Sequence, residues 1–151
     1  MKFVYDDGGR AAAGYKGRTG DCVVRAIAIA CQIPYQEVYD AINLLSRMEG
    51  NHGTRNRSSA RRGVRRTTYE EYLGQLGWVW VPTMRIGSGC RVHLKAEELP
   101  AGHLIVRLSR HLCAVHGGVI HDIYNPDRQG SRCVYGYFTP AQGRNLREEC
   151  A

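Results

Sequence analysis

The sequence predicts an α+β protein in which helices of the N-terminal half pack on an antiparallel sheet formed by the C-terminal half. Apolar residues recur at helical spacing in the first half, whereas short apolar runs separated by turn residues follow one another from Trp78 onward. Helices first and antiparallel strands later are typical of this fold class. A length of 151 residues fits one domain, and 43% apolar residues indicate a globular chain.

Three helices are expected in the first half of the chain. Asp21 is a good N-cap residue, and residues 22–30 after it are apolar almost all round, which is typical of a buried central helix. Pro34 suits the first turn of a second helix, whose apolar residues recur at helical spacing. Thr68 is expected to cap a third helix over residues 69–76.

Short strands are expected in the second half, each bounded by Gly, Pro or polar residues. Gly117 and Gly118 predict a hairpin turn between two of them, because glycine adopts the backbone conformations that tight hairpins need. Residues 1–20 are rich in glycine and small side chains and are expected to be irregular. The expected strands are residues 78–81, 90–94, 103–108, 111–116, 119–124 and 132–138.

The formal net charge of +7 comes almost entirely from one segment. Six arginines and no acid lie between positions 55 and 66, which leaves a balance of one positive charge elsewhere. Because it is polar and has few apolar anchors, the stretch 50–66 is expected to form a weakly packed loop inserted into a single domain, residues 1–151. Such a loop could bind nucleic acid or an acidic partner, cover a cleft as a lid, or remain solvated. Its arginines are Arg55, Arg57, Arg61, Arg62, Arg65 and Arg66.

The cysteines are expected to be free thiols. The N-terminus has no apolar segment followed by a cleavage site, so no secretory signal is expected and the reducing cytoplasm is the expected location. No apolar run approaches the roughly 20 residues of a membrane helix, and no membrane partner is expected. Without a Cys-x-x-Cys pair, and with the histidines of 111–121 divided between two strand faces, neither a metal nor another cofactor is expected. The cysteines are Cys22, Cys31, Cys90, Cys113, Cys133 and Cys150.

Cys22 is the candidate nucleophile. It stands in the first turn of the expected helix 22–30, where a helix N-terminus favours the thiolate over the thiol. The structural alternative is a small apolar side chain at a crowded helix start. A thiolate needs a histidine that holds it as an ion pair and transfers protons. His111, at the start of an expected strand, is suited to face the start of the helix.

Two segments resemble papain-like cysteine peptidases. They are Gly-Asp-Cys-Val-Val-Arg-Ala at residues 20–26 and the stretch from His111 to Asn125-Pro126. Both are similar to the bacteriocin-processing peptidase domains of ABC exporters, in which a histidine opens a hairpin and an Asp-Pro closes it, and to uncharacterised bacteriophage proteins. The resemblance covers residues 14–138. It implies a papain-like fold, a thiol hydrolase acting on a peptide or protein, and a phage-encoded protein in the host bacterial cytoplasm.

The third catalytic residue depends on the length of the hairpin turn. A two-residue turn at 117–118 places Asp122 on the same face as His111, one diagonal away. A three-residue turn places Asn125 directly opposite His111. The second register gives the more apolar helix-facing surface and agrees with the resembling family. Asn125 is therefore expected to orient His111, with Asp122 as the alternative.

One position departs from the resembling family. Those peptidases carry a glutamine six residues before the cysteine as an oxyanion-hole donor, and Lys16 stands there in this chain. Lys16, Thr19 or the backbone N–H of Cys22 is expected to donate instead.

Two functions are compatible with these sequence features. One is a cysteine peptidase or related thiol acyl-transfer hydrolase with a Cys22–His111–Asn125 triad. The other is a catalytically silent protein of the same fold that engages nucleic acid or a host protein through its arginine-rich loop.

Overall fold

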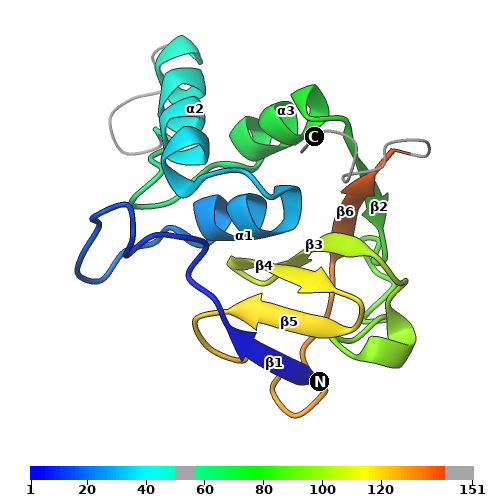
Figure 1. The fold of residues 1–151 in the computed structure, drawn as a ribbon. Coiled ribbons are helices and arrows are strands. Elements are labelled where there is room, and N and C mark those ends of the chain that lie inside the picture. Colours follow the sequence, from blue (N-terminus) through cyan, green and yellow to red (C-terminus); the bar gives the residue numbers. More distant parts are fainter. Residues whose placement is uncertain (50–56, 142–151) are drawn as a thin grey trace.

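Three α-helices and a six-stranded sheet make up the described chain, residues 1–49 and 57–141 of the computed structural model (Figure 1). The expected α+β class is confirmed. The helices are α1 (Cys22–Cys31), α2 (Tyr35–Met48) and α3 (Arg66–Gln75), with one short 3₁₀ turn, η1 (Ala96–Glu98). The strands are β1 (Lys2–Tyr5), β2 (Trp78–Pro82), β3 (His103–Leu108), β4 (His111–His116), β5 (Val119–Asp122) and β6 (Gly136–Pro140).

The strands form one sheet in the order β1-β5-β4-β3-β6-β2. Neighbouring strands are antiparallel except at one edge, where β1 lies parallel to β5. The sheet is therefore mixed, and the expectation of an antiparallel sheet preceded by an irregular N-terminus is wrong at β1. All four residues of β1 are exposed, so the segment lacks the alternation of buried and exposed residues that predicts a strand.

The helices cover one face of the sheet, and α1 packs directly on β3 and β4 (Figure 1). One core cluster joins the three helices to side chains such as Ile105 of β3 and Leu112 of β4. A second cluster, which includes Leu104 and Cys113, contains no residue of these helices, because successive residues of a strand point to opposite faces. Seven of the ten residues of α1 are buried, so the expected central helix is confirmed.

The start of α3 differs from the expected one. The helix begins at Arg66, so Thr68 lies inside the first turn and does not cap it. The Thr68 hydroxyl is buried and donates to Glu49 Oε1 at 2.5 Å, and it lies 2.6 Å from the Ser58 hydroxyl. Thr68 therefore ties α3 to the end of α2 and to the segment between them.

The arginine-rich segment is packed where the structure describes it. Residues 59–63 form a tight turn closed by a backbone bridge between Ser59 and Gly63. Ala60 is fully buried, and its N–H donates to Asn43 Oδ1 on α2 at 3.0 Å. The expectation of a weakly packed insertion is wrong here, because small residues let the turn fold closely against the helices.

The same turn also crosses the chain that leads into α1. The N–H of Gly20 donates to the carbonyl of Arg61 at 2.8 Å. A Cβ on Gly20 would lie 2.5 Å from the backbone oxygen of Arg62, so this close crossing requires glycine. Residues 50–56 of the expected loop, which include Arg55, lie outside the described residues.

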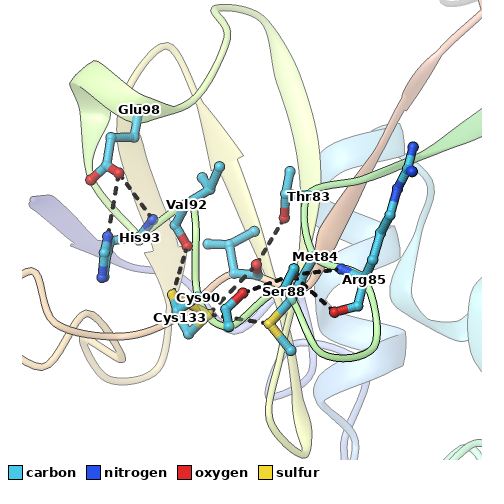
Figure 2. Close-up of a disulfide and its surroundings, with 11 residues drawn as sticks. Thr83, Met84, Arg85, Ser88, Cys90, Val92, His93, Glu98 and Cys133 are labelled. Atoms are coloured by element: carbon cyan, nitrogen blue, oxygen red, sulfur yellow. Dashed lines mark hydrogen bonds and ion pairs between the residues drawn. A yellow bond between two sulfur atoms is a disulfide. The ribbon is translucent and has the colours of Figure 1, made fainter.

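A disulfide joins Cys90 to Cys133, 43 residues apart in the sequence (Figure 2). The expectation of free thiols is wrong for this pair. The expected strand over 90–94 is also wrong, since only an isolated bridge forms there, between His93 and Cys133. The disulfide and this bridge fasten an irregular segment to the chain that precedes β6. No local sequence pattern predicts that Cys90 pairs with Cys133.

Loss of this disulfide is expected to lower the free energy of unfolding by about 2–4 kcal/mol, because the cross-link restricts a long loop of the unfolded chain. Urea unfolding of a Cys90→Ser/Cys133→Ser variant against the wild-type chain measures the change. Dithiothreitol should destabilise the wild-type chain and leave the double variant unchanged. A non-reduced peptide map in which residues 90 and 133 lie in separate, unlinked peptides would contradict the cross-link.

Candidate active site

Cys22 is the first residue of α1 and is half-buried. An α-helix leaves the N–H groups of its first turn without intrahelical partners, and their partial positive charge favours an anion at that end. Two groups of β4, the His111 ring and the backbone N–H of Leu112, lie close enough to the thiol to lower its pKa. Cys22 therefore lies where the N-terminus of α1 meets the start of β4.

His111 opens β4, and its side chain is buried between two partners. Its Nε2 lies 2.6 Å from Oδ2 of Asp122, the last residue of β5. With Nε2 engaged by the carboxylate, Nδ1 is the ring nitrogen left for Cys22. The ring thus bridges the thiol and the carboxylate, which is the arrangement of a nucleophile, a base and a group that orients the base.

The register of the hairpin decides the third residue. His116 pairs with Val119, so the turn contains only Gly117 and Gly118, and both have positive φ angles. The expected three-residue turn is therefore wrong, and Asp122 takes the place expected for Asn125 beside His111.

Asn125 instead forms a hydrogen bond with the backbone of the next turn. Its Oδ1 accepts a hydrogen bond from the Asp127 N–H at 3.0 Å, and the residue is exposed. This local hydrogen bond accounts for an asparagine at the position without any contact to the histidine.

The charges of the site reinforce one another. Burial opposes a charged His111 ring, but the hydrogen bonds and negative charges of Asp122 and Cys22 outweigh it and raise the pKa of His111 to about 9. Burial likewise opposes a Cys22 thiolate, but His111, the Leu112 N–H and the Arg25 guanidinium outweigh it and lower the pKa of the thiol. Each charge therefore stabilises the other, so the pair favours thiolate and imidazolium more than two separate side chains would.

A buried ion network lies directly behind the triad. Arg25, in the middle of α1, pairs through Nη1 with Oδ1 of Asp21, and its Nη2 lies 3.7 Å from Oδ1 of Asp122. Asp21 has no exposed surface and accepts further hydrogen bonds from the hydroxyls of Tyr35 at 2.6 Å and Thr19 at 2.7 Å. Asp21 therefore stands at the N-cap position without capping the helix. The sequence feature that could have predicted this network is the spacing of Asp21 and Arg25, since the arginine stands four residues after the aspartate in an otherwise apolar helix.

The two side chains expected to donate to an oxyanion do not reach the site. Thr19 gives its hydroxyl to Asp21, and Lys16 is exposed, with its carbonyl accepting from Arg61 at 2.8 Å. Neither residue lines the cleft beside Cys22. The backbone N–H groups at the start of α1, including that of Cys22, are the donors that remain at this end of the helix.

Cys22 and His111 open into a cleft of about 490 Å³. Its walls are the start of α1, the turn at 62–64, the start of α3 and the turn between β3 and β4. Of the six arginines expected to bind a partner, Arg62 and Arg66 line the cleft. The end of β3 and the turn that follows it add two arginines that the sequence analysis missed, although one stands directly before His111. They are Arg107 and Arg110.

Among residues 1–49 and 57–141, no group of three or more His, Cys, Asp or Glu side chains is arranged to hold a metal ion. No helix within the same ranges combines the length and apolar character needed to cross a membrane.

Comparison of the chain with protein-family models, with curated proteins and with solved structures gave no match. The chemistry of the site is therefore inferred from its geometry.

Proposed function

We propose that the protein is a cysteine peptidase, or a related thiol acyl-transfer hydrolase, with a papain-like arrangement of a nucleophile-bearing helix packed on a sheet. The observation that carries the proposal is the His111 ring, held by Asp122 at 2.6 Å beside the same cleft as a Cys22 thiol at a helix N-terminus. The orienting residue is an aspartate, so the triad proposed is Cys22, His111 and Asp122. The adjacent cleft supplies the space for a substrate.

In the first half of the reaction the Cys22 thiolate attacks the carbonyl carbon of an amide. A C–S bond forms, and the π electrons of the carbonyl move to its oxygen, where N–H groups at the start of α1 stabilise the oxyanion. The electrons then return, the C–N bond breaks, and His111 gives its Nδ1 proton to the leaving amine. The products of this half are a thioester on Cys22 and a neutral His111.

Water completes the second half of the reaction. Neutral His111 takes a proton from the water as the oxygen attacks the thioester carbon. The C–S bond breaks, the acid product leaves, and the thiolate and imidazolium are restored. Throughout, Asp122 fixes the ring and stabilises its positive charge without itself taking the proton.

The pH dependence of the two reactivities of Cys22 tests this proposal. Iodoacetamide should alkylate Cys22 rapidly already at neutral pH, because His111 lowers the pKa of the thiol. Peptide hydrolysis should follow a bell-shaped profile. It falls at acidic pH as the thiolate is protonated, and it falls again as the pH passes about 9, where His111 loses the proton that the leaving group needs.

Peptide mapping after limited alkylation identifies the cysteine that reacts. Cys113 is the internal reference, because burial raises the pKa of its thiol and should keep it unreactive. The variant His111→Ala should return the alkylation of Cys22 to the behaviour of an ordinary thiol, with a rate that rises only near pH 8.5. The same late rise in the wild-type chain would refute the ion pair and indicate the catalytically silent binding protein instead.

A further inference from the structure

The cleft beside Cys22 carries an unbalanced positive charge. Within the described part of the chain, four arginines line it, whereas no Asp or Glu does. They come from three separate parts of the fold, namely the turn before α3, the start of α3, and the end of β3 with the turn after it. Distant segments of the chain therefore bring like charges together around the proposed nucleophile, although like charges repel and such a gathering costs stability.

Three of the four arginines have no carboxylate partner among residues 1–49 and 57–141, and they are Arg62, Arg107 and Arg110. The fourth, Arg66, forms an exposed ion pair with Glu70 at 2.5 Å and stacks over the Trp80 ring at 5.4 Å. Arg107 in turn lies over the Tyr135 ring, 5.9 Å from its centre. Aromatic rings thus hold two guanidinium groups at the cleft while leaving N–H donors for a ligand.

The cleft continues into a second hollow of about 420 Å³, which shares Arg66, Arg107 and Tyr135 with it. This hollow adds an apolar wall that includes Trp80, Met84 and Ile86. Ile86 is fully exposed and adds apolar surface to this hollow, beside Trp80 and Met84.

The segment that carries this apolar wall is fastened at several points (Figure 2). Cys133 of the disulfide contacts the Met84 sulfur at 3.8 Å. The Thr83 hydroxyl donates to the Val134 carbonyl at 2.8 Å, and the Ser88 hydroxyl closes a turn on Arg85. The wall is therefore held in place beside the cleft and does not depend on a ligand for its position.

We propose that the cleft binds an acidic peptide segment as the substrate, an inference that rests on the proposed function. Carboxylates of the peptide pair with Arg62, Arg107 and Arg110, whose planar guanidinium groups suit two-point hydrogen bonding to carboxylates. A neighbouring apolar side chain of the peptide covers Ile86 and Trp80. Nucleic acid fits the site less well, because a phosphodiester backbone offers no acyl carbon for Cys22 to attack.

Matched peptide libraries test the substrate class. Each pair differs only by Glu or Gln at one position, so the two peptides have the same shape and differ in charge. The wild-type chain should cleave the preferred Glu peptides about tenfold faster at low salt, and the preference should shrink at 0.5 M NaCl as the charges are screened. The variant Arg107→Gln/Arg110→Gln should lose the preference, because its cleavage of Glu peptides falls more than its cleavage of Gln peptides. Arg47→Gln removes one charge from the exposed side of α2, away from the cleft, and should keep the preference.

A second measurement separates this inference from the proposed function. Iodoacetate and iodoacetamide alkylate the same thiol, but only iodoacetate carries a negative charge. The ratio of their rates at Cys22 should be about tenfold higher in the wild-type chain than in Arg107→Gln/Arg110→Gln. Equal ratios together with equal cleavage of Glu and Gln peptides would overturn the acidic substrate and leave the peptidase standing.

Binding to a Cys22→Ala variant covers the case in which no peptide is cleaved. The proposed function then fails, whereas tighter binding of Glu peptides than of Gln peptides still supports an acidic ligand in this cleft. Tighter binding of a single-stranded oligonucleotide than of a Glu peptide of equal charge would overturn the proposal, and so would no preference for either peptide.

Discussion

Replacing Asp122 by asparagine is expected to lower kcat/KM for peptide hydrolysis by a factor of about 10² to 10⁴, a loss typical of a triad whose carboxylate becomes a neutral amide. The amide keeps the size of the side chain but removes the negative charge 2.6 Å from His111. Burial of His111 remains and opposes its charge, so the pKa of the ring should fall from about 9 toward or below its ordinary value. The alkaline limb of the hydrolysis profile should then move to lower pH.

Asn125→Ala is the matched control for this prediction. Asn125 is exposed, and its Oδ1 accepts a hydrogen bond from the backbone N–H of Asp127 in the next turn, so hydrolysis should change by less than about threefold. Urea unfolding of both variants checks that a loss of activity is not a loss of fold. A large loss in Asn125→Ala and none in Asp122→Asn would restore the three-residue turn and reject the triad proposed here.

The choice between Asp122 and Asn125 shows where local patterns stop being informative. Strands on both sides of two glycines are compatible with either turn length, yet a slip of one residue changes which side chain meets His111. The three-residue register is the more apolar one because it pairs Cys113 with Ile123. In the structure Cys113 packs into the cluster that contains no helix residue, and Ile123 is exposed. Apolar matching therefore carried no information about the register at this position.

Most helices and strands were predictable, because their apolar residues repeat with the spacing of a helix or form short runs bounded by turn residues, as strands do. The juxtaposition of Cys22 with His111 was also predictable, since each residue opens an element and the fold class brings the two elements together. Features that depend on contacts between distant segments of the chain were not predictable from the sequence. The pairing of β1 with β5 and the Cys90–Cys133 disulfide join segments with no shared pattern. The tight packing of residues 57–66 depends on contacts between small residues and helices elsewhere in the chain. The many arginines of this segment therefore indicated a solvated loop, although the segment contains a structured turn.

The substitution Arg25→Met is expected to lower the free energy of unfolding by about 3–5 kcal/mol, the usual cost of removing one member of a buried ion pair. Arg25 is only 5% exposed and lies between Asp21 and Asp122, both of which are also buried. Methionine fills much of the same volume, so the loss should come mainly from two buried carboxylates that each lose one cationic neighbour, with Arg10 left beside Asp21 and His111 beside Asp122. Urea unfolding measures it, and Arg47→Met on the exposed side of α2 should change stability by less than about 0.5 kcal/mol.

The same substitution should also alter the thiol, because the Arg25 charge helps to lower the pKa of Cys22. The sign follows from the charge. Without the guanidinium the thiolate is less stable, so the acid limb of the Cys22 alkylation profile should move to higher pH. The double variant Asp21→Asn/Arg25→Met removes both members of one pair and should be less destabilised than the sum of the single variants. Additive losses would show that Asp21 and Arg25 are not coupled, and an Arg25→Met variant as stable as the wild-type chain would show that the buried network does not support the fold.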